Sequence, residues 1–147
     1  MNEISVRLAY KEDIKGMYAV EKSSFSSYWS YDSFVENYYN ESSVYIAAEM
    51  SDIIIGFAGM QIVLDEAHIM NVAVLKDFRR MGAADKMIDL IKREAKLRGA
   101  TVMYLEVRKS NVAAQSLYCK HNFKVLGIRK KYYSNNDEDA IIMVADL

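Results

Sequence analysis

The sequence contains no proline, a single cysteine and no long apolar run among its 147 residues. A single cysteine, Cys119, excludes a disulfide within the chain, which fits a reducing compartment. No apolar run approaches the ~18 residues that a membrane-spanning helix needs, and the N-terminus is too polar for a signal peptide. These absences predict a cytoplasmic protein that does not associate with membranes.

Charge of either sign is also not in excess, since 19 Lys and Arg stand against 20 Asp and Glu. Direct binding to nucleic acid usually needs a basic surface, so we expect none. The two histidines, His68 and His121, lie far apart and have no ligand-like neighbours in the sequence, so we expect no metal site. Cys119 is expected to be a small core residue rather than a nucleophile.

Hydrophobic residues make up 52% of the chain and charged residues 27%, which is typical of a folded globular protein. The length predicts one domain covering residues 1–147, and no linker or repeat interrupts it. Alternating and helical spacings of apolar residues predict a mixed α/β fold. The predicted strands are 4–8, 44–49, 53–63, 67–74, 101–107, 123–130 and 140–144. The predicted helices are 11–24, a short one capped by Ser30, 84–98, and one capped by Ser110 or Asn111 that runs through His121.

Strand order follows from the lengths of the connections. Short turns join the strands 44–49, 53–63 and 67–74, which predicts an antiparallel meander. A long helix joins 67–74 to 101–107, so these two strands should be parallel neighbours. The polar, tyrosine-bearing segment 132–138 is expected to be a loop between the last two strands.

The segment between strand 67–74 and the long helix could bind an anion. A helix N-terminus presents free N–H groups and a positive dipole end, and Gly82 and Ala83 would let a phosphate approach the backbone. Arg79 and Arg80 add positive charge. The loop alone favours an ordinary helix start with solvated arginines, because it is neither a Walker A loop nor a dinucleotide fingerprint.

Two residues carry groups suited to acyl transfer to an amine. Glu106 ends an apolar row at the carboxyl end of its strand, where it could accept the proton of an amine. Tyr118 lies two helical turns after Asn111 and could protonate a leaving thiolate. Spacing alone favours simpler roles, with Glu106 paired to Arg108 or Lys109 and Tyr118 as a core residue.

Several motifs together resemble one family. Arg79-x-x-Gly82-x-Ala84 resembles the acetyl-CoA loop of the GNAT acetyltransferases, Gln/Arg-x-x-Gly-x-Gly/Ala. Residues 106–118 are similar to Glu-Val-Arg-x-Ser-Asn-x-x-Ala-x-x-Leu-Tyr of the ribosomal-protein-alanine N-acetyltransferases. Residues 25–30 resemble that family's Phe-x-x-Pro-Trp-Ser loop, and 127–133 and 138–143 resemble its C-terminal motifs. The resemblance covers nearly the whole chain, with Tyr28 in place of a proline and Asn122 and Ala84 in place of glycines.

The resemblance implies a GNAT fold: a mixed, mostly antiparallel sheet of about seven strands, with a central parallel pair splayed around acetyl-CoA and about four helices on its faces. It implies acetyl-CoA as cosubstrate, no metal, Glu106 as general base and Tyr118 as general acid. The implied acetyl-CoA contacts are Val72, Ala73, Val74, Arg79, Arg80, Met81, Gly82, Ala83, Ala84, Asp85 and Asn111. The implied substrate contacts are Phe25, Trp29, Tyr132 and Tyr133.

The implied partner is the N-terminus of a ribosomal protein, typically its N-terminal alanine, or of another protein. We expect a monomer or a weak dimer. Two alternatives remain open: a GNAT enzyme that acetylates a small amine or a lysine side chain, and a coenzyme A-binding module without turnover.

Overall fold

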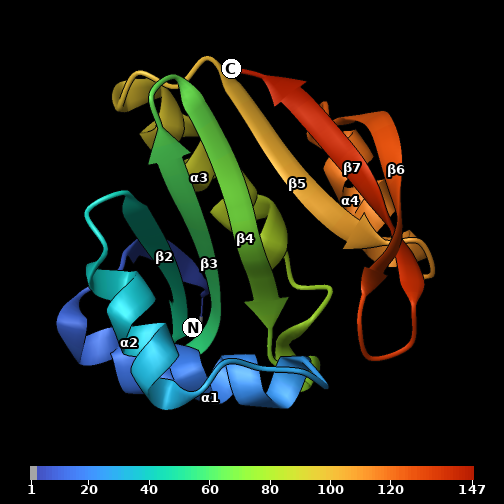
Figure 1. Ribbon diagram of the computed structural model, residues 1–147. Helices are drawn as coiled ribbons and strands as arrows, with labels where there is room; N and C mark the ends of the chain where they lie inside the picture. The colour runs from blue at the N-terminus through green and yellow to red at the C-terminus, as the bar shows by residue number, and fades with distance from the viewer. Residues whose placement is uncertain (1–2) are drawn as a thin grey trace.

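The computed structural model describes residues 3–147. A seven-stranded sheet forms its centre, with the strands in the order β1-β2-β3-β4-β5-β7-β6 (Figure 1). Neighbouring strands are antiparallel except for β4 and β5, which are parallel. The strands are β1 Ser5–Leu8, β2 Ser43–Met50, β3 Ile53–Val63, β4 Glu66–Val74, β5 Val102–Arg108, β6 Lys124–Tyr133 and β7 Glu138–Asp146.

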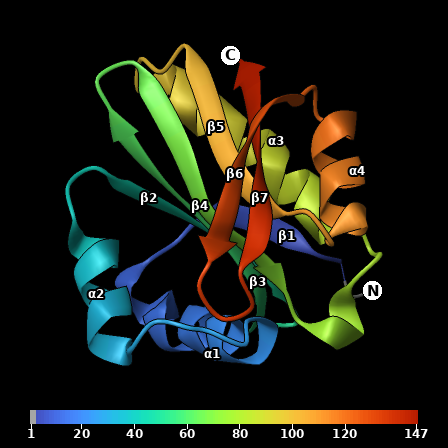
Figure 2. The same ribbon diagram turned by 45° about the vertical axis from the view of Figure 1, so that its right-hand side comes forward.

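Four α-helices cover the two faces of this sheet, and each face has its own core (Figures 1 and 2). Alternate residues of one strand point to opposite faces. Ile46 and Ala48 of β2 therefore pack into the core beneath α3, whereas Tyr45 and Ala47 pack into the core beneath α1 and α2. The helices are α1 Ile14–Ser24, α2 Tyr31–Tyr39, α3 Ala83–Leu97 and α4 Val112–Lys120. Short 3₁₀ turns, Lys11–Asp13 and Lys76–Phe78, precede α1 and α3.

The parallel strands β4 and β5 are paired only at their beginning. Register partners run from Glu66 with Val102 to His68 with Tyr104, and in the described chain no pair follows. Beyond that point β4 stays hydrogen-bonded to β3 and β5 to β7, and the register of β3 and β4 shifts next to Met60. The strands diverge toward their carboxyl ends (Figure 1). This confirms the expected mixed sheet with a splayed central pair.

The predicted elements are all present, but two expectations were wrong. The segment 132–138 is not a loop throughout, because β6 continues through Tyr133 and β7 begins at Glu138. Its strand character was hidden because β6 is an exposed edge strand without a clear apolar face. Cys119 is exposed rather than in the core. Successive helical residues point about 100° apart, so α4 buries Tyr118 and turns Cys119 to the solvent.

In residues 3–147, no helix combines the length and apolarity that crossing a bilayer would require.

Candidate active site

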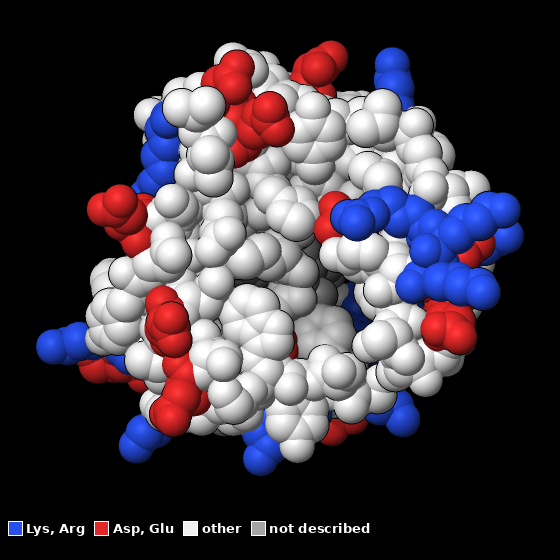
Figure 3. Space-filling model, in the orientation of Figure 1, with Lys and Arg blue, Asp and Glu red and all other residues white. Residues whose placement is uncertain are grey.

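A cavity of about 580 Å³ opens where β4 and β5 part. Figure 3 shows this hollow with mostly uncharged walls, and a group of Lys and Arg side chains on its β6 side. The cavity brings together segments that are far apart in the sequence: α1 with the loop after it, β4, β5, α4 and the β6–β7 turn. Of the residues predicted for the site, the lining contains Phe25, Trp29, Val72, Glu106, Asn111, Tyr118, Tyr132 and Tyr133.

Glu106 projects from β5 into a small polar cluster. Both of its carboxylate oxygens lie 2.9 Å from Nε2 of His68, and the hydroxyl of Tyr132 donates to Oε1 at 3.2 Å. The hydrogen bond from His68 is the main reason that the pKa of Glu106 lies below its ordinary value, and the same bond raises the pKa of His68. Glu106 is therefore an ionised carboxylate at neutral pH.

Sequence reasoning missed His68, which was considered only as a metal ligand. In the described chain, no group of three or more His, Cys, Asp and Glu side chains could hold a metal ion. The signal that could have revealed its contact was the predicted parallel pairing of 67–74 with 101–107. In that pairing His68 lies opposite Tyr104 of β5. Glu106 is two residues further along β5, so its side chain lies on the same face of the sheet as that of Tyr104.

Tyr118 and Asn111 both come from α4. Tyr118 is buried against Phe123, and burial raises the pKa of its hydroxyl to about 12. The phenol is therefore protonated at neutral pH, as a proton donor must be. Asn111 caps the helix, since its side-chain oxygen accepts from the N–H of Ala114 at 3.1 Å. The cap falls on the second of the two predicted candidates, Ser110 and Asn111.

Another missed residue, Glu21, fixes the loop that carries Trp29. Glu21 lies on α1 and is only 2% exposed. Its carboxylate accepts from the backbone N–H of Trp29 at 3.2 Å and from Nδ2 of Asn71 on β4 at 3.1 Å. Tyr18 adds a third link, because its hydroxyl donates to the carbonyl of Trp29 at 2.7 Å. The available signal was an acidic residue in the apolar stripe of the predicted helix 11–24.

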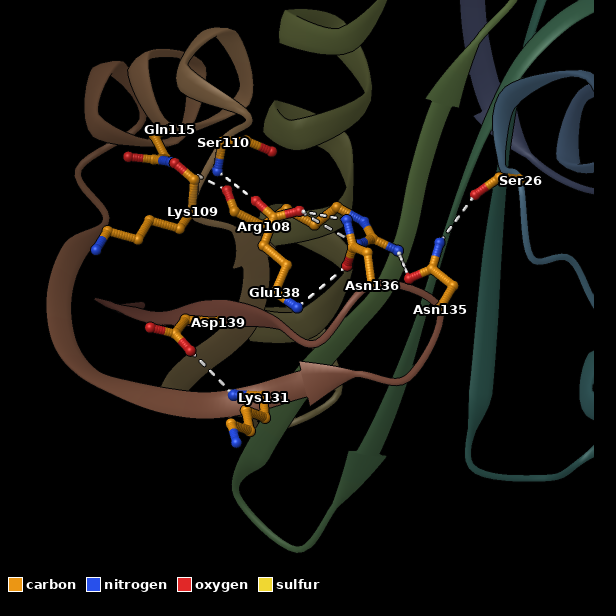
Figure 4. A network of polar contacts seen from close by, with 10 residues as sticks. All are labelled: Ser26, Arg108, Lys109, Ser110, Gln115, Lys131, Asn135, Asn136, Glu138 and Asp139. Atoms are coloured by element: carbon orange, nitrogen blue, oxygen red, sulfur yellow. Dashed lines mark hydrogen bonds and ion pairs between the residues drawn. The ribbon is translucent and has the colours of Figure 1, made fainter.

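The β6–β7 turn reaches across toward α1 and the loop that follows it (Figure 2). A polar network centred on Arg108 holds this turn in place (Figure 4). Arg108 donates to Asn135 at 2.9 Å, pairs with Glu138 at 3.3 Å and lies 3.9 Å over the ring of Tyr133. Asn135 in turn donates to Ser26 at 3.2 Å. The network connects the end of β5 with the two aromatic segments that flank the cavity, namely residues 25–29 and residues 132–133.

Glu138 joins the same network to the start of α4. Its carboxylate accepts from the N–H of Ser110 at 2.6 Å, and the hydrogen bonds with Ser110 lower the pKa of Glu138 to about 2. Tyr132 and Tyr133 follow one another at the end of β6, with their rings nearly perpendicular and 5.0 Å apart. Tyr132 contacts Glu106, whereas Tyr133 faces Arg108.

The predicted phosphate loop lies at the end of β4 and does not line the cavity. Gly82 is the N-cap of α3 at φ +86°, and an added Cβ would meet nothing within 4 Å. The loop is therefore open beside the helix N-terminus. The predicted contacts outside the cavity lining are Ala73, Val74, Arg79, Arg80, Met81, Gly82, Ala83, Ala84 and Asp85.

Two side chains of this loop are held by protein contacts. Arg79 donates to the carbonyl of Val74 at 3.0 Å, so part of its guanidinium group is held by the backbone of β4. Asp85 turns toward α4, with Oδ1 at 2.8 Å from His121 and 3.1 Å from Lys120. The hydrogen bond from His121 is the largest cause of the lowered pKa of Asp85. Both contacts hold the carboxylate of Asp85 toward α4, and the charge of Lys120 offsets that of Asp85 beside the open loop.

The model of the Acetyltransferase (GNAT) family matches residues 14–123. The chain belongs to this family. It is 35% identical over 145 residues to the ribosomal protein bS18-alanine N-acetyltransferase of Salmonella typhimurium, covering 97% of this chain and 96% of that one. The crystal structure of the ribosomal-protein-S18-alanine N-acetyltransferase from Escherichia coli superposes with a TM-score of 0.88 at 34% identity, covering 99% of this chain and 94% of that chain.

A more distant structure shows the same fold. NAA60 of Arabidopsis thaliana, solved in complex with acetyl-CoA, superposes with a TM-score of 0.89 at 19% identity and covers 99% of this chain. The expected GNAT fold, the resemblance to the ribosomal-protein-alanine N-acetyltransferases and the assignment as an acetyltransferase are thus confirmed.

Proposed function

We propose that this GNAT enzyme, acting as one domain, transfers the acetyl group of acetyl-CoA to the N-terminal α-amine of a small-subunit ribosomal protein whose first residue is alanine. The observation that carries the proposal is the cavity at the splayed strands, which holds an ionised Glu106 and a protonated Tyr118 between two aromatic segments. The names of the relatives from Salmonella and Escherichia coli support the choice of acceptor.

The surroundings of the cavity fit acetyl-CoA. Residues 69–74 of β4 have no register partner on β5, so the free edge of this strand can pair with an extended ligand. That edge leads to the open backbone at Gly82, where the N-terminus of α3 can receive a pyrophosphate. Acetyl-CoA supplies a thioester, whose carbonyl carbon is the electrophile. A backbone N–H of Val72 to Val74 would polarise that carbonyl.

The residues of the cavity can complete the transfer. Glu106 accepts the proton that the acceptor ammonium must lose before its nitrogen attacks the thioester carbonyl carbon. The C–N bond forms and the C–S bond breaks as Tyr118 donates a proton to the departing thiolate. The second proton, which the nitrogen loses as the amide forms, returns to the oxygen of Tyr118, and the proton on Glu106 passes to solvent. Phe25, Trp29, Tyr132 and Tyr133 would enclose the first residues of the acceptor. Asn111 would contact coenzyme A from the start of α4.

The test uses purified protein, acetyl-CoA and peptides that begin with Ala, Ser or Met, with an N-acetylated Ala peptide as the matched control. We expect thiol release with free Ala peptides and none with the blocked peptide. A protein that acetylates only polyamines or lysine side chains would overturn the acceptor assignment. A protein that binds acetyl-CoA and acetylates none of these amines would overturn the proposed activity itself.

A further inference from the structure

The cavity contains a second carboxylate, Glu21, to which neither the family resemblance nor the proposed mechanism gives a task. Asp13, the other buried acid of the described chain, pairs with Arg7 at 2.7 Å, and Glu106 pairs with His68. Glu21 has no ion-pair partner among residues 3–147, and its two hydrogen bonds come from neutral groups, Trp29 N–H and Asn71 Nδ2. It is a buried carboxyl group that has no cation beside it in the part of the chain that the structure describes.

Such a group is costly to bury, because neutral donors replace only part of the hydration that a carboxylate loses. Burial accordingly raises the pKa of Glu21 above its ordinary value. One turn further along α1, the buried hydroxyl of Ser24 has no hydrogen-bond partner in the described structure. Glu21 and Ser24 both line the cavity. The cavity wall therefore presents a carboxylate and a hydroxyl group to which no cationic side chain of the described residues donates a hydrogen bond.

We propose that Glu21, assisted by Ser24, binds the protonated α-amine of the acceptor protein. An ammonium group carries one positive charge and three N–H donors, which match an unpaired carboxylate and a free hydroxyl oxygen. The inference rests on the proposed function and adds how the acceptor's N-terminus is recognised. It also divides the work between the two acids: Glu21 attracts and orients the ammonium, and Glu106 takes the proton.

This division predicts a particular kinetic signature. A carboxylate beside an ammonium stabilises the charged form and so makes deprotonation harder. Glu21 should therefore strengthen peptide binding without speeding the chemical step. The competing explanation is that Glu21 only anchors the Trp29 loop through its hydrogen bonds.

Glu21→Gln separates these explanations, because glutamine can keep both hydrogen bonds. Its oxygen can accept from Trp29 N–H, and its NH₂ group can donate to Asn71 once that amide is flipped. Trp29 is the only tryptophan, so its fluorescence reports directly on whether the loop is in place. Glu12→Gln, an exposed site just before α1, is the matched control.

The experiment measures steady-state acetylation of a free Ala peptide at pH 7.5 by the wild type, Glu21→Gln and Glu12→Gln. We expect the KM for peptide to rise on the order of tenfold in Glu21→Gln, as for one lost charged contact. The value of kcat should be equal or higher, and the KM for acetyl-CoA and the Trp29 emission should not change. An unchanged KM for peptide with native emission would overturn the proposal, as would a fall in kcat alone.

A second measurement needs no variant and so does not depend on how Glu21→Gln folds. The free Ala peptide and its des-amino analogue, which lacks the ammonium, compete with a fluorescent peptide for the wild type in the presence of coenzyme A. We expect the ammonium peptide to bind on the order of tenfold more tightly. Equal affinities would overturn the role of Glu21 even if wild-type acetylation is robust. Failure of the wild type to acetylate any peptide would instead count against the proposed function.

Discussion

At the scale of single residues, the two carboxylates of the cavity differ in their surroundings. A hydrogen bond from His68 holds the pKa of Glu106 low, whereas burial among neutral donors holds that of Glu21 high. When the environments of two acids in one site shift their pKa values in opposite directions, the two acids usually have different roles. Glu106 is also the acid with a ready path for its proton, since His68 at 2.9 Å is half exposed to solvent.

The proposed base predicts the effect of Glu106→Gln, which removes the proton acceptor and keeps the size of the side chain. We expect kcat for a free Ala peptide to fall by about 10²–10⁴-fold, the usual contribution of a general base. The measurement is kcat at saturating acetyl-CoA, with acetyl-CoA affinity as the control for folding. A variant within threefold of the wild type would contradict the role, and Tyr118→Phe tests the acid in the same assay.

The pair formed by His68 and Glu106 predicts a pH-dependent stability. The pKa of His68 is raised above 6.5, so its contribution is complete below that pH and is lost as the pH rises through the raised value. The pKa of Glu106 is lowered below 4.5, so its contribution is present above that pH and is lost in more acidic solution. The ion pair therefore contributes most between these two pH values.

We therefore expect His68→Gln to reduce the free energy of unfolding more at pH 5.5 than at pH 8.5. Urea denaturation of the wild type and the variant at both pH values measures the difference. A difference that is equal at both pH values, or larger at pH 8.5, would show that the ion pair does not stabilise the fold.

At the scale of elements, the turn between β4 and α3 contains a backbone conformation on which the proposed binding of acetyl-CoA depends. Gly82 at φ +86° begins α3, and Gly99 at φ +90° follows its end. In both places a Cβ would meet nothing within 4 Å, so a substitution disturbs only the backbone conformation. The two glycines are a matched pair, of which only Gly82 lies in the proposed phosphate loop.

Alanine at either glycine should lower Tm by roughly 2–8 °C, since the left-handed conformation costs about 1–2 kcal/mol for a residue with a Cβ. Only Gly82→Ala should also raise the KM for acetyl-CoA severalfold, because its Cβ and strained backbone lie where the pyrophosphate is expected. Calorimetry and initial rates test both statements. If Gly82→Ala and Gly99→Ala have the same KM for acetyl-CoA, the loop at Gly82 does not bind the pyrophosphate.

The sequence predicted elements well where a local pattern determines them. The apolar stripe of α3 and the short turns between β2, β3 and β4 were sufficient to predict the parallel crossover to β5. The contacts of His68 and Glu21 could not be found in this way, because each depends on a partner about 40–50 residues distant. The extent of the β6–β7 turn was also mispredicted, because the Arg108 network that orders the turn comes from another strand.

At the scale of the whole molecule, the splayed strands divide the sheet into two parts with few direct links. The strands β1 to β4 form one part, and β5, β7 and β6 form the other, joined by three register pairs at the start of β4 and β5. The core beneath α3 spans both parts, with Ile91 from the helix and Met103 from β5. A ligand lying between the strands would add a link where the sheet itself has none.

Acetyl-CoA should therefore stabilise the fold and protect a defined region. At a concentration of 100 Kd, binding adds about 2.7 kcal/mol, which corresponds to a rise in Tm of roughly 5–10 °C. Hydrogen exchange should slow most in residues 69–74 and 79–85. Residues 69–74 lack partners on β5 and can pair with the ligand, and residues 79–85 form the proposed phosphate loop. Protection confined to the β6–β7 turn, or a Tm that does not depend on acetyl-CoA, would place the ligand elsewhere. Coenzyme A without the acetyl group should protect the same segments, because the contacts proposed there are to the pantetheine arm and the pyrophosphate.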